Sequence, residues 1–179
     1  MDIKSFHHVA YRCKDAKETA DFYGDIVGLP YTFAVAEDRQ PTTGEDHPYM
    51  HLFFQLGDGS FLAFFELPGE QPMGRDENTP AWVQHLAFDV GDMETLMKKK
   101  KHLEDNGIEV LGPTDHTFCQ SIYFFDPNGH RLEFLVPTTT EKMVNDLVGV
   151  AKPMLDEWAA NKKAPRHADW VHEKALARF

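Results

Sequence analysis

A pattern of eight residues occurs twice in this chain and limits what the chain can fold into. One copy is HVAYRCKD, which begins at His8, and the other is HLAFDVGD, which begins at His85. In both copies Ala follows two positions after the His, and Asp follows seven positions after it. A long period with only two copies predicts one folding unit built from two similar halves rather than a solenoid.

The two halves carry the same order of expected elements. The first half predicts a strand at 6–13, a helix that Asp15 caps and Gly28 ends, a strand at 31–36, and a hairpin formed by 49–56 and 60–67. The second half predicts a strand at 82–90, a helix from Asp92 to about Asn106, a strand at 108–111, and a hairpin formed by 118–125 and 130–136. Helices are expected in the tail at about 140–160 and 167–177, where they would pack on the sheet, on a partner subunit or over a cavity mouth.

Composition excludes several classes of partner. The chain of 179 residues has 42% hydrophobic and 26% charged residues, which is ordinary for a globular protein. Its net charge of -11 argues against nucleic acid and against anionic membrane surfaces as partners. The two cysteines, Cys13 and Cys119, form no CxxC pair, and the N-terminal stretch lacks the apolar core of a signal peptide. We therefore expect a cytoplasmic protein without a membrane-spanning segment.

The repeat of strand, helix and three strands, with these motifs, resembles the vicinal-oxygen-chelate superfamily over roughly residues 5–137. That superfamily includes glyoxalase I, extradiol ring-cleavage dioxygenases, and the bleomycin and fosfomycin resistance proteins. The resemblance implies an α+β fold in which two βαβββ modules, about 5–67 and 82–137, pair into a curled mixed sheet around a metal cavity. It further implies a vicinal-oxygen-chelate domain at 1–137, a helical C-terminal extension at 138–179, a small-molecule substrate and a homodimer.

The resemblance places metal ligands on the first and last strands of the modules, and this selects His8, His85 and Glu133. The two histidines occupy the same position in both repeats, and Glu133 lies between Leu132 and Phe134 in an apolar strand. An unpaired buried carboxylate is costly, and a metal would relieve that cost. Two imidazoles and one carboxylate suit Fe(II), which keeps positions open for substrate and oxygen, and Zn, Ni and Mn are the alternatives.

A fourth ligand would change the chemistry, and Glu66 is the nearest residue that can supply it. The turn glycines Gly59 and Gly129 align the two hairpins, and four residues after them stand Ala63 and Glu133. Glu66 lies an odd number of residues from Ala63, so an unbulged strand directs it to the opposite face, and a bulge would reverse this. Glu66 is therefore either a fourth ligand or an acid at the rim.

A narrower resemblance concerns the extradiol dioxygenases. Their signature is satisfied by Thr114-Asp-His116, five residues, Ile122-Tyr123, two residues, Asp126-Pro127-Asn128-Gly129, three residues, and Glu133. It implies that His116 and Tyr123 are catalytic residues, which hydrogen-bond the substrate and help proton transfer. The alternative is that they are a loop histidine and a half-buried strand tyrosine.

Three further features bear on the substrate. Arg12, four residues after the first predicted ligand, would bind a substrate carboxylate or form a salt bridge at the sheet rim. Phe64 belongs to a run of phenylalanines that would form an aromatic substrate wall or pack the core. Extradiol enzymes usually carry another acid–base His near the start of the strand at 60–67, but Ser60 or Phe61 stands there, and His51 is the neighbouring substitute.

The leading hypothesis is a metal-dependent enzyme that acts on a small oxygenated substrate, diol-like or aromatic, and is closest to an extradiol dioxygenase. One alternative is a glyoxalase-type isomerase or lyase, similar to lactoylglutathione lyase, with Glu66 as fourth ligand and Zn or Ni as the metal. Another is a non-catalytic binding or resistance protein that sequesters a small molecule. Oxygen uptake, oxygen-independent turnover and metal-free ligand binding separate the three hypotheses.

Overall fold

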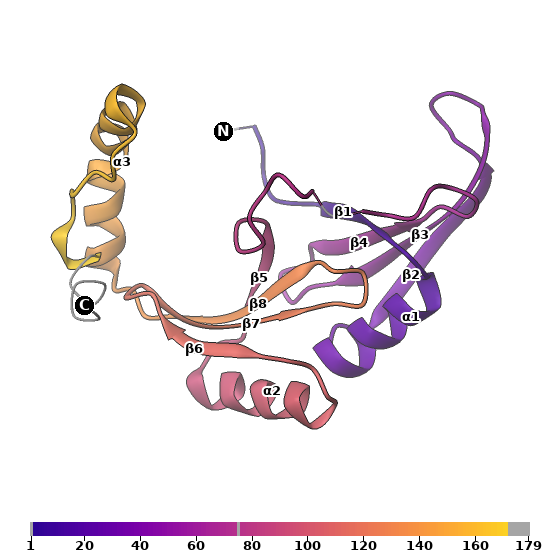
Figure 1. Cartoon of the computed structure of the whole chain (residues 1–179), viewed down its shortest axis with the longest axis horizontal. Helices are drawn as coiled ribbons and strands as arrows, with labels where there is room; N and C mark the ends of the chain where they lie inside the picture. The colour runs from indigo at the N-terminus through magenta and orange to yellow at the C-terminus, as the bar shows by residue number, and fades with distance from the viewer. Residues whose placement is uncertain (1, 75, 172–179) are drawn as a thin grey trace. The chain divides into compact units, whose positions relative to one another are not determined.

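The computed structural model describes residues 2–74 and 76–171 (Figure 1). The strands are β1 (His8–Cys13), β2 (Tyr31–Arg39), β3 (Asp46–Gln55), β4 (Phe61–Glu66), β5 (His85–Asp89), β6 (Leu111–Asp115), β7 (Cys119–Phe125) and β8 (Arg131–Pro137). The helices are α1 (Ala16–Asp21), which continues into the π-helix η1 (Phe22–Val27), α2 (Met93–Asp105), α3 (Glu141–Asn161) and the 3-10 helix η2 (Asp169–Val171). Each half follows the predicted order of strand, helix and three strands.

The strands form two four-stranded sheets that share one order. The first sheet runs β1-β4-β3-β2, and the second runs β5-β8-β7-β6. In the first sheet β1 is parallel to β4, whereas β3 pairs antiparallel with both β4 and β2. This repeated arrangement, followed by the helix α3, confirms the predicted α+β fold of two modules and a helical tail.

Helix α1 and its continuation η1 cover one face of the first sheet (Figure 1). Tyr23 of η1 is fully buried, and its ring centroid lies 4.9 Å from that of Phe64 and 5.4 Å from that of Phe54. Side chains alternate along a strand, so Leu62 and Phe64 of β4 face the helices. The odd-numbered residues of β4 consequently lie on the face turned away from α1.

Helix α2 lies along one face of the second sheet. The buried rings of Phe124 and Phe134 have centroids 4.9 Å apart, and the ammonium of Lys99 in α2 lies 4.9 Å from the Phe134 ring centroid. The same alternation therefore leaves Tyr123 and Glu133 on the face of this sheet turned away from α2.

The chain divides into two compact units, and the division does not follow the repeat. The first unit contains Met1–Leu86, His102–Ile108 and Phe125–Arg131, and the second contains Ala87–Lys101, Glu109–Phe124 and Leu132–Phe179. The turn between β7 and β8 thus belongs to the first unit, with β1 and α1.

A buried polar cluster holds this turn in the first unit. The Asn128 carboxamide accepts a hydrogen bond of 2.8 Å from the backbone N–H of Lys14 and donates to Thr19 Oγ1 at 3.2 Å and Asp126 Oδ2 at 3.0 Å. The phenol of Tyr23 also donates to Asp126, at 3.1 Å. Burial, followed by the charge of Asp126, raises the pKa of Tyr23 well above its usual range. These polar groups tolerate burial because each has hydrogen-bond partners.

One strand begins later than the sequence predicts. The strand predicted at 108–111 is β6, at Leu111–Asp115. Gly107 ends α2 with a φ of +77°, and the N–H of Ile108 then donates to the carbonyl of Leu103 at 3.0 Å. Because this helix cap occupies the residues after Gly107, strand pairing starts only beyond them.

The tail agrees with the prediction in its first part. Helix α3 confirms the helix expected at 140–160, and Thr140 Oγ1 caps it by accepting from the N–H of Met143 at 3.2 Å. The helix expected at 167–177 is represented by η2, and residues 172–177 lie outside the described residues. Among the helices of the described ranges, none combines the length and the apolar character that crossing a membrane requires.

We expect Asn128→Ala to lower the free energy of unfolding by about 1–3 kcal/mol, since it leaves buried hydrogen-bonding groups unpaired. Urea unfolding followed by circular dichroism measures this change. The matched control is Asn145→Ala on the exposed side of α3, for which we expect a change within about 0.5 kcal/mol. Equal stabilities of the two variants would contradict the role given to Asn128.

Candidate functional site

The face on which Glu66 lies is decided by the alternation along β4. This strand pairs with β1 and with β3 in unbroken register, so no bulge exchanges its faces. Glu66 lies on the helix side with Phe64, where its Oε2 accepts a hydrogen bond of 2.7 Å from the N–H of Ala16 at the start of α1. A carboxylate is favourable at a helix N-terminus. The residue that matches Glu133, four positions after its turn glycine, is Ala63 on the opposite face.

His85, the first residue of β5, has one ring nitrogen held by the backbone. Its Nδ1 lies 3.1 Å from the carbonyl oxygen of Val83, and because a carbonyl only accepts, Nδ1 carries the hydrogen. The lone pair then lies on Nε2. Metal-binding histidines commonly use this arrangement, in which a backbone carbonyl orients one nitrogen and the other nitrogen binds the ion.

His8 lies among rings on the face of the first sheet turned away from α1. Its Nδ1 lies 2.7 Å from Nδ1 of His7, and its ring centroid lies 5.6 Å from that of Phe53 and 5.9 Å from that of His51. His51 stacks on Phe65 with centroids 3.6 Å apart. Burial, and then the charge of His8, lowers the pKa of His51 to about 4, and its Nε2 is buried without a hydrogen-bond partner. A neutral imidazole therefore stands beside the first predicted ligand.

Glu133, Tyr123 and His116 come together on the face of the second sheet turned away from α2. The phenol of Tyr123 donates to Glu133 Oε1 at 3.1 Å, and the phenol oxygen lies 2.8 Å from Nε2 of His116. Because the phenol hydrogen goes to the carboxylate, the Nε2–H of His116 donates to the phenol oxygen. A line of hydrogen bonds thus ends on Glu133, which is only 4% exposed.

The surroundings of Tyr123 keep its phenol protonated. Burial is the main cause that raises the pKa of Tyr123 to about 12, and Glu133 adds to it through its charge and its hydrogen bond, against a lowering by Ser121. Ionisation would place a second negative charge beside a buried carboxylate. At neutral pH the phenol is a hydrogen-bond donor, which suits an oxygen that develops negative charge.

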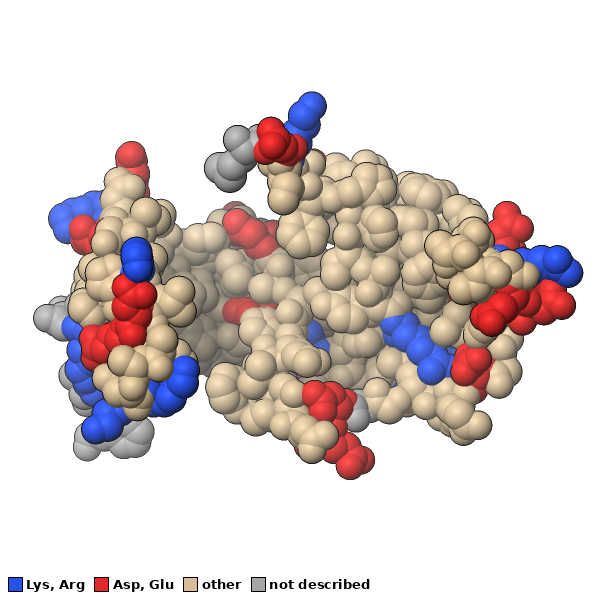
Figure 2. Space-filling model, turned by 90° about the horizontal axis from the view of Figure 1, so that it is seen from above, with Lys and Arg blue, Asp and Glu red and all other residues tan. Residues whose placement is uncertain are grey.

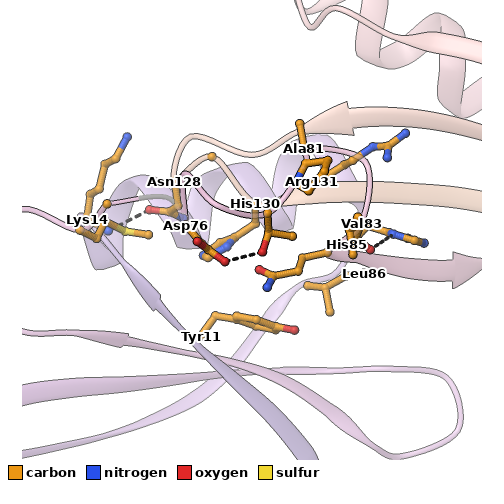
Figure 3. Close-up of a pocket in the computed structure, with 16 residues that line it drawn as sticks. Tyr11, Lys14, Asp76, Ala81, Val83, His85, Leu86, Asn128, His130 and Arg131 are labelled. Atoms are coloured by element: carbon orange, nitrogen blue, oxygen red, sulfur yellow. Dashed lines mark hydrogen bonds between the residues drawn. The ribbon is translucent and has the colours of Figure 1, made fainter. Parts of the chain in front are cut away.

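A cavity of about 710 Å³ lies within the first compact unit and reaches His85 (Figure 3). Tyr11 of β1, the segment before β5 and the turn before β8 bound it. The side chains of Lys14, Arg131 and His130 in its wall donate to backbone carbonyl oxygens at 2.9, 2.7 and 2.8 Å. The cavity therefore brings one predicted ligand to a polar wall, and neither of the other two predicted ligands lines it.

The two predicted substrate residues, Arg12 and Phe64, lie in different surroundings. Arg12 donates from Nη2 to the carbonyl of Gln71 at 2.7 Å, and its Nε is buried without a hydrogen-bond partner. This bond goes to a backbone oxygen and not to the carboxylate that a rim salt bridge needs. Phe64 has no exposed surface and packs against Tyr23, so its expected place in a substrate wall is corrected to the core.

The predicted ligands fit a divalent metal by their chemistry. Two imidazoles and one carboxylate are ligands that Fe(II), Mn(II) and Zn(II) accept, and in the neutral ring of His85 the hydrogen on Nδ1 leaves Nε2 as the nitrogen with the lone pair. His8 and His85 belong to the first compact unit and Glu133 to the second. Within residues 2–74 and 76–171, no group of three or more His, Cys, Asp or Glu side chains is gathered as a metal site. Their convergence on one ion therefore stays a prediction.

Sequence reasoning misses two residues that shape this region, Asn128 and His130. Asn128 belongs to the stretch that the sequence predicts only as a tight turn, and His130 is the first residue of the strand predicted after it. Asp and Asn in such turns commonly hydrogen-bond backbone groups nearby, and this was the available signal for Asn128. The ring of His130 lies 5.1 Å from that of Tyr11, a contact between residues far apart in the sequence that no local pattern indicates.

Comparison with known proteins identifies the relatives of most of the chain. The sequence model of the Glyoxalase/Bleomycin resistance protein/Dioxygenase superfamily matches residues 5–134. A metallothiol transferase FosB from Staphylococcus saprophyticus is 31% identical over 143 residues, which cover 79% of this chain and 82% of that protein. A biphenyl-2,3-diol 1,2-dioxygenase from Rhodococcus globerulus is 28% identical over 131 residues, which cover 72% of this chain and 61% of that protein. A glyoxalase/dioxygenase structure from Nostoc punctiforme has a TM-score of 0.57 at 27% identity and covers 77% of this chain and 94% of its own.

We expect Tyr123 to keep its proton until the pH approaches 12. Because this pKa lies above the ordinary value of 10.0, the stability contributed by the neutral phenol is complete below pH 10 and is lost as the pH rises through 12. A titration of the tyrosine ¹³Cζ signals by NMR measures the pKa, and Tyr123→Phe assigns the signal. Tyr31→Phe, at an exposed position, should remove a different signal. A Tyr123 signal that titrates near pH 10 would refute the assignment.

Proposed function

Because the chain belongs to the glyoxalase, bleomycin resistance protein and dioxygenase superfamily, we propose that it is a divalent-metal-dependent enzyme for a small substrate with two neighbouring oxygens. His8, His85 and Glu133 would hold the metal, with Fe(II) favoured over Mn, Zn and Ni. When bound, the metal would supply Lewis-acid polarisation of the substrate oxygens. The observation that carries the proposal is the line of hydrogen bonds from His116 through Tyr123 to Glu133.

In this proposal Tyr123 and His116 move protons at the substrate. The phenol, protonated at neutral pH, donates to a substrate oxygen as negative charge develops on it. Nε2 of His116 lies 2.8 Å from the phenol oxygen, so its hydrogen can replace the one that the phenol donates. The lone pair on Nδ1 of His116 can accept a hydrogen in return. A diol gives up protons on binding and its products regain them, so a pair that both donates and accepts suits a ring-cleavage dioxygenase.

The acid–base His that extradiol enzymes usually carry near residue 60 has a substitute in this proposal. His51 lies beside His8, with ring centroids 5.9 Å apart, and its buried Nε2 has no hydrogen-bond partner. We propose that this nitrogen accepts a hydrogen bond from the substrate. The hydrogen bond from Ala16 to Glu66 favours the three-ligand site over the glyoxalase-type site with a fourth ligand.

A second candidate function is metal-dependent transfer of a thiol to a small oxygenated substrate. The 31% identity to a metallothiol transferase over 79% of the chain favours it. Thiol consumption in the presence of fosfomycin would identify this activity, and oxygen uptake with catechols would identify the first. In both cases we propose a cytoplasmic homodimer, with residues 1–137 as the catalytic domain and 138–179 as a helical extension.

We expect His8→Ala and Glu133→Gln to reduce the metal bound per chain at least tenfold, since each removes a proposed ligand. Glu66→Gln should keep the wild-type content, because its carboxamide oxygen can still accept from the N–H of Ala16. Elemental analysis of protein equilibrated with Fe(II) or Mn(II) gives the result. Equal metal content in the Glu66 and Glu133 variants would reject the three-ligand site.

We expect Tyr123→Phe to lower kcat with catechols by about 10²–10⁴-fold, because the phenol no longer moves a proton. The metal content should stay unchanged, and Tyr31→Phe should keep full activity. An oxygen electrode and a panel of catechols provide the measurement. Wild-type protein loaded with Fe(II) that takes up no oxygen with any diol would exclude the dioxygenase function and leave the thiol transferase to be tested.

A further inference from the structure

A smaller cavity of about 270 Å³ lies at the end of β4 in the first compact unit. It is lined by residues of the β2–β3 connection, of β3 and of the end of β4, namely Gln40, Pro41, His47, Tyr49, Phe65 and Leu67. None of these residues has a part in the chemistry proposed above. The cavity is therefore a feature that the proposed function leaves without a role.

A series of rings connects the first predicted ligand to this cavity. The ring centroid of His8 lies 5.9 Å from that of His51, which lies 3.6 Å from that of Phe65, which in turn lies 5.6 Å from that of Tyr49. All four lie on the face turned away from α1. Phe61 pairs with His8 in the sheet, and four residues of strand from Phe61 to Phe65 span roughly 13 Å. The cavity thus lies roughly 13 Å along the strand from His8, the first proposed ligand.

Two polar side chains in the cavity wall, those of Gln40 and His47, already have partners. Oε1 of Gln40 accepts from the backbone N–H groups of Thr42 and Thr43 at 2.7 and 2.6 Å. Nε2 of His47 pairs with Glu70 at 2.8 Å. The rest of the wall consists of Pro41, Phe65, Leu67 and the ring and hydroxyl of Tyr49. Figure 2 shows few Lys, Arg, Asp and Glu side chains over the strands of the first sheet. A charged group would therefore lose its hydration in this cavity without gaining an unpaired counter-charge from the lining residues.

We propose that this cavity binds an uncharged apolar arm of the substrate, about one aromatic ring in size. The inference rests on the proposed function for the oxygenated head, which would lie at His8. A dry apolar cavity of about 150 Å³ is large enough for benzene, so one ring with a small substituent fits here. The rings of Phe65 and Tyr49 offer stacked and edge contacts to such an arm.

The test uses fluorobenzene as the arm alone and the metal-free full chain, with binding followed by ¹⁹F NMR. We expect saturable binding to the wild type and an affinity at least tenfold lower for Leu67→Trp, which fills the cavity. Leu111→Trp, which adds the same side chain at an exposed position of β6, should bind like the wild type. Any of three results would overturn the proposal. These are no saturable binding to the wild type, an affinity of Leu67→Trp within twofold of the wild type, and an equal loss of affinity in both variants.

A second variant protects the test against misfolding. If circular dichroism shows that Leu67→Trp does not fold, Tyr49→Ala removes a ring of the wall and should weaken fluorobenzene binding at least threefold, and an unchanged affinity would overturn the proposal. In active enzyme, Leu67→Trp should raise KM for 4-phenylcatechol tenfold more than KM for catechol. Fluorobenzene binding without metal uptake would reject the proposed function alone, and metal uptake and turnover without fluorobenzene binding would reject the arm site alone.

Discussion

The alternation of side chains along the last strand of each module decides which groups are available for chemistry. One face of each sheet lies against a helix, and the other carries the residues that the proposed function needs. Glu66 and Glu133 are both acids in such a strand, yet only Glu133 faces away from the helix. Glu66 binds the start of α1 instead. A register shift of one residue would exchange the two faces, so the unbroken pairing of β4 keeps Glu66 on the helix side.

The residues of the dioxygenase signature fall into two physical groups. Asp126 and Asn128 are buried and hydrogen-bond the backbone of Lys14 and side chains of α1 and η1, so their role is to hold a turn. His116, Tyr123 and Glu133 form a line of hydrogen bonds and can move protons or bind a cation. A signature can therefore be satisfied for reasons of folding as well as of chemistry, and only the second group bears on the proposed reaction.

The repeat predicts the fold well because it fixes the order of elements, and strand alternation then predicts the opposite faces of Ala63 and Glu66. The late start of β6 is not predictable from local pattern, because it follows from the hydrogen bond between Ile108 and Leu103 that extends the cap of α2. Hydrogen bonds between residues distant in sequence cannot be predicted from local pattern either. For this reason the sequence predicts neither the hydrogen bond of Glu66 to the start of α1 nor the burial of Asn128. The metal set remains a prediction, because its members belong to different compact units.

The two modules share one order of strands but differ at the positions that correspond to Tyr123 and Glu133. Counted back from the turn glycines Gly59 and Gly129, Phe53 matches Tyr123, and counted forward, Ala63 matches Glu133. Phe53 and Ala63 are direct partners across β3 and β4, so the first module carries a phenyl and a methyl group where the second carries a phenol and a carboxylate. The proposed metal site needs only the carboxylate of Glu133. The first module, which has Ala63 at the matching position, can therefore present carbon surface to a ligand. In the proposed function, therefore, the phenol and the carboxylate come from the second sheet alone, whereas the first sheet contributes His8, His51 and the apolar surface.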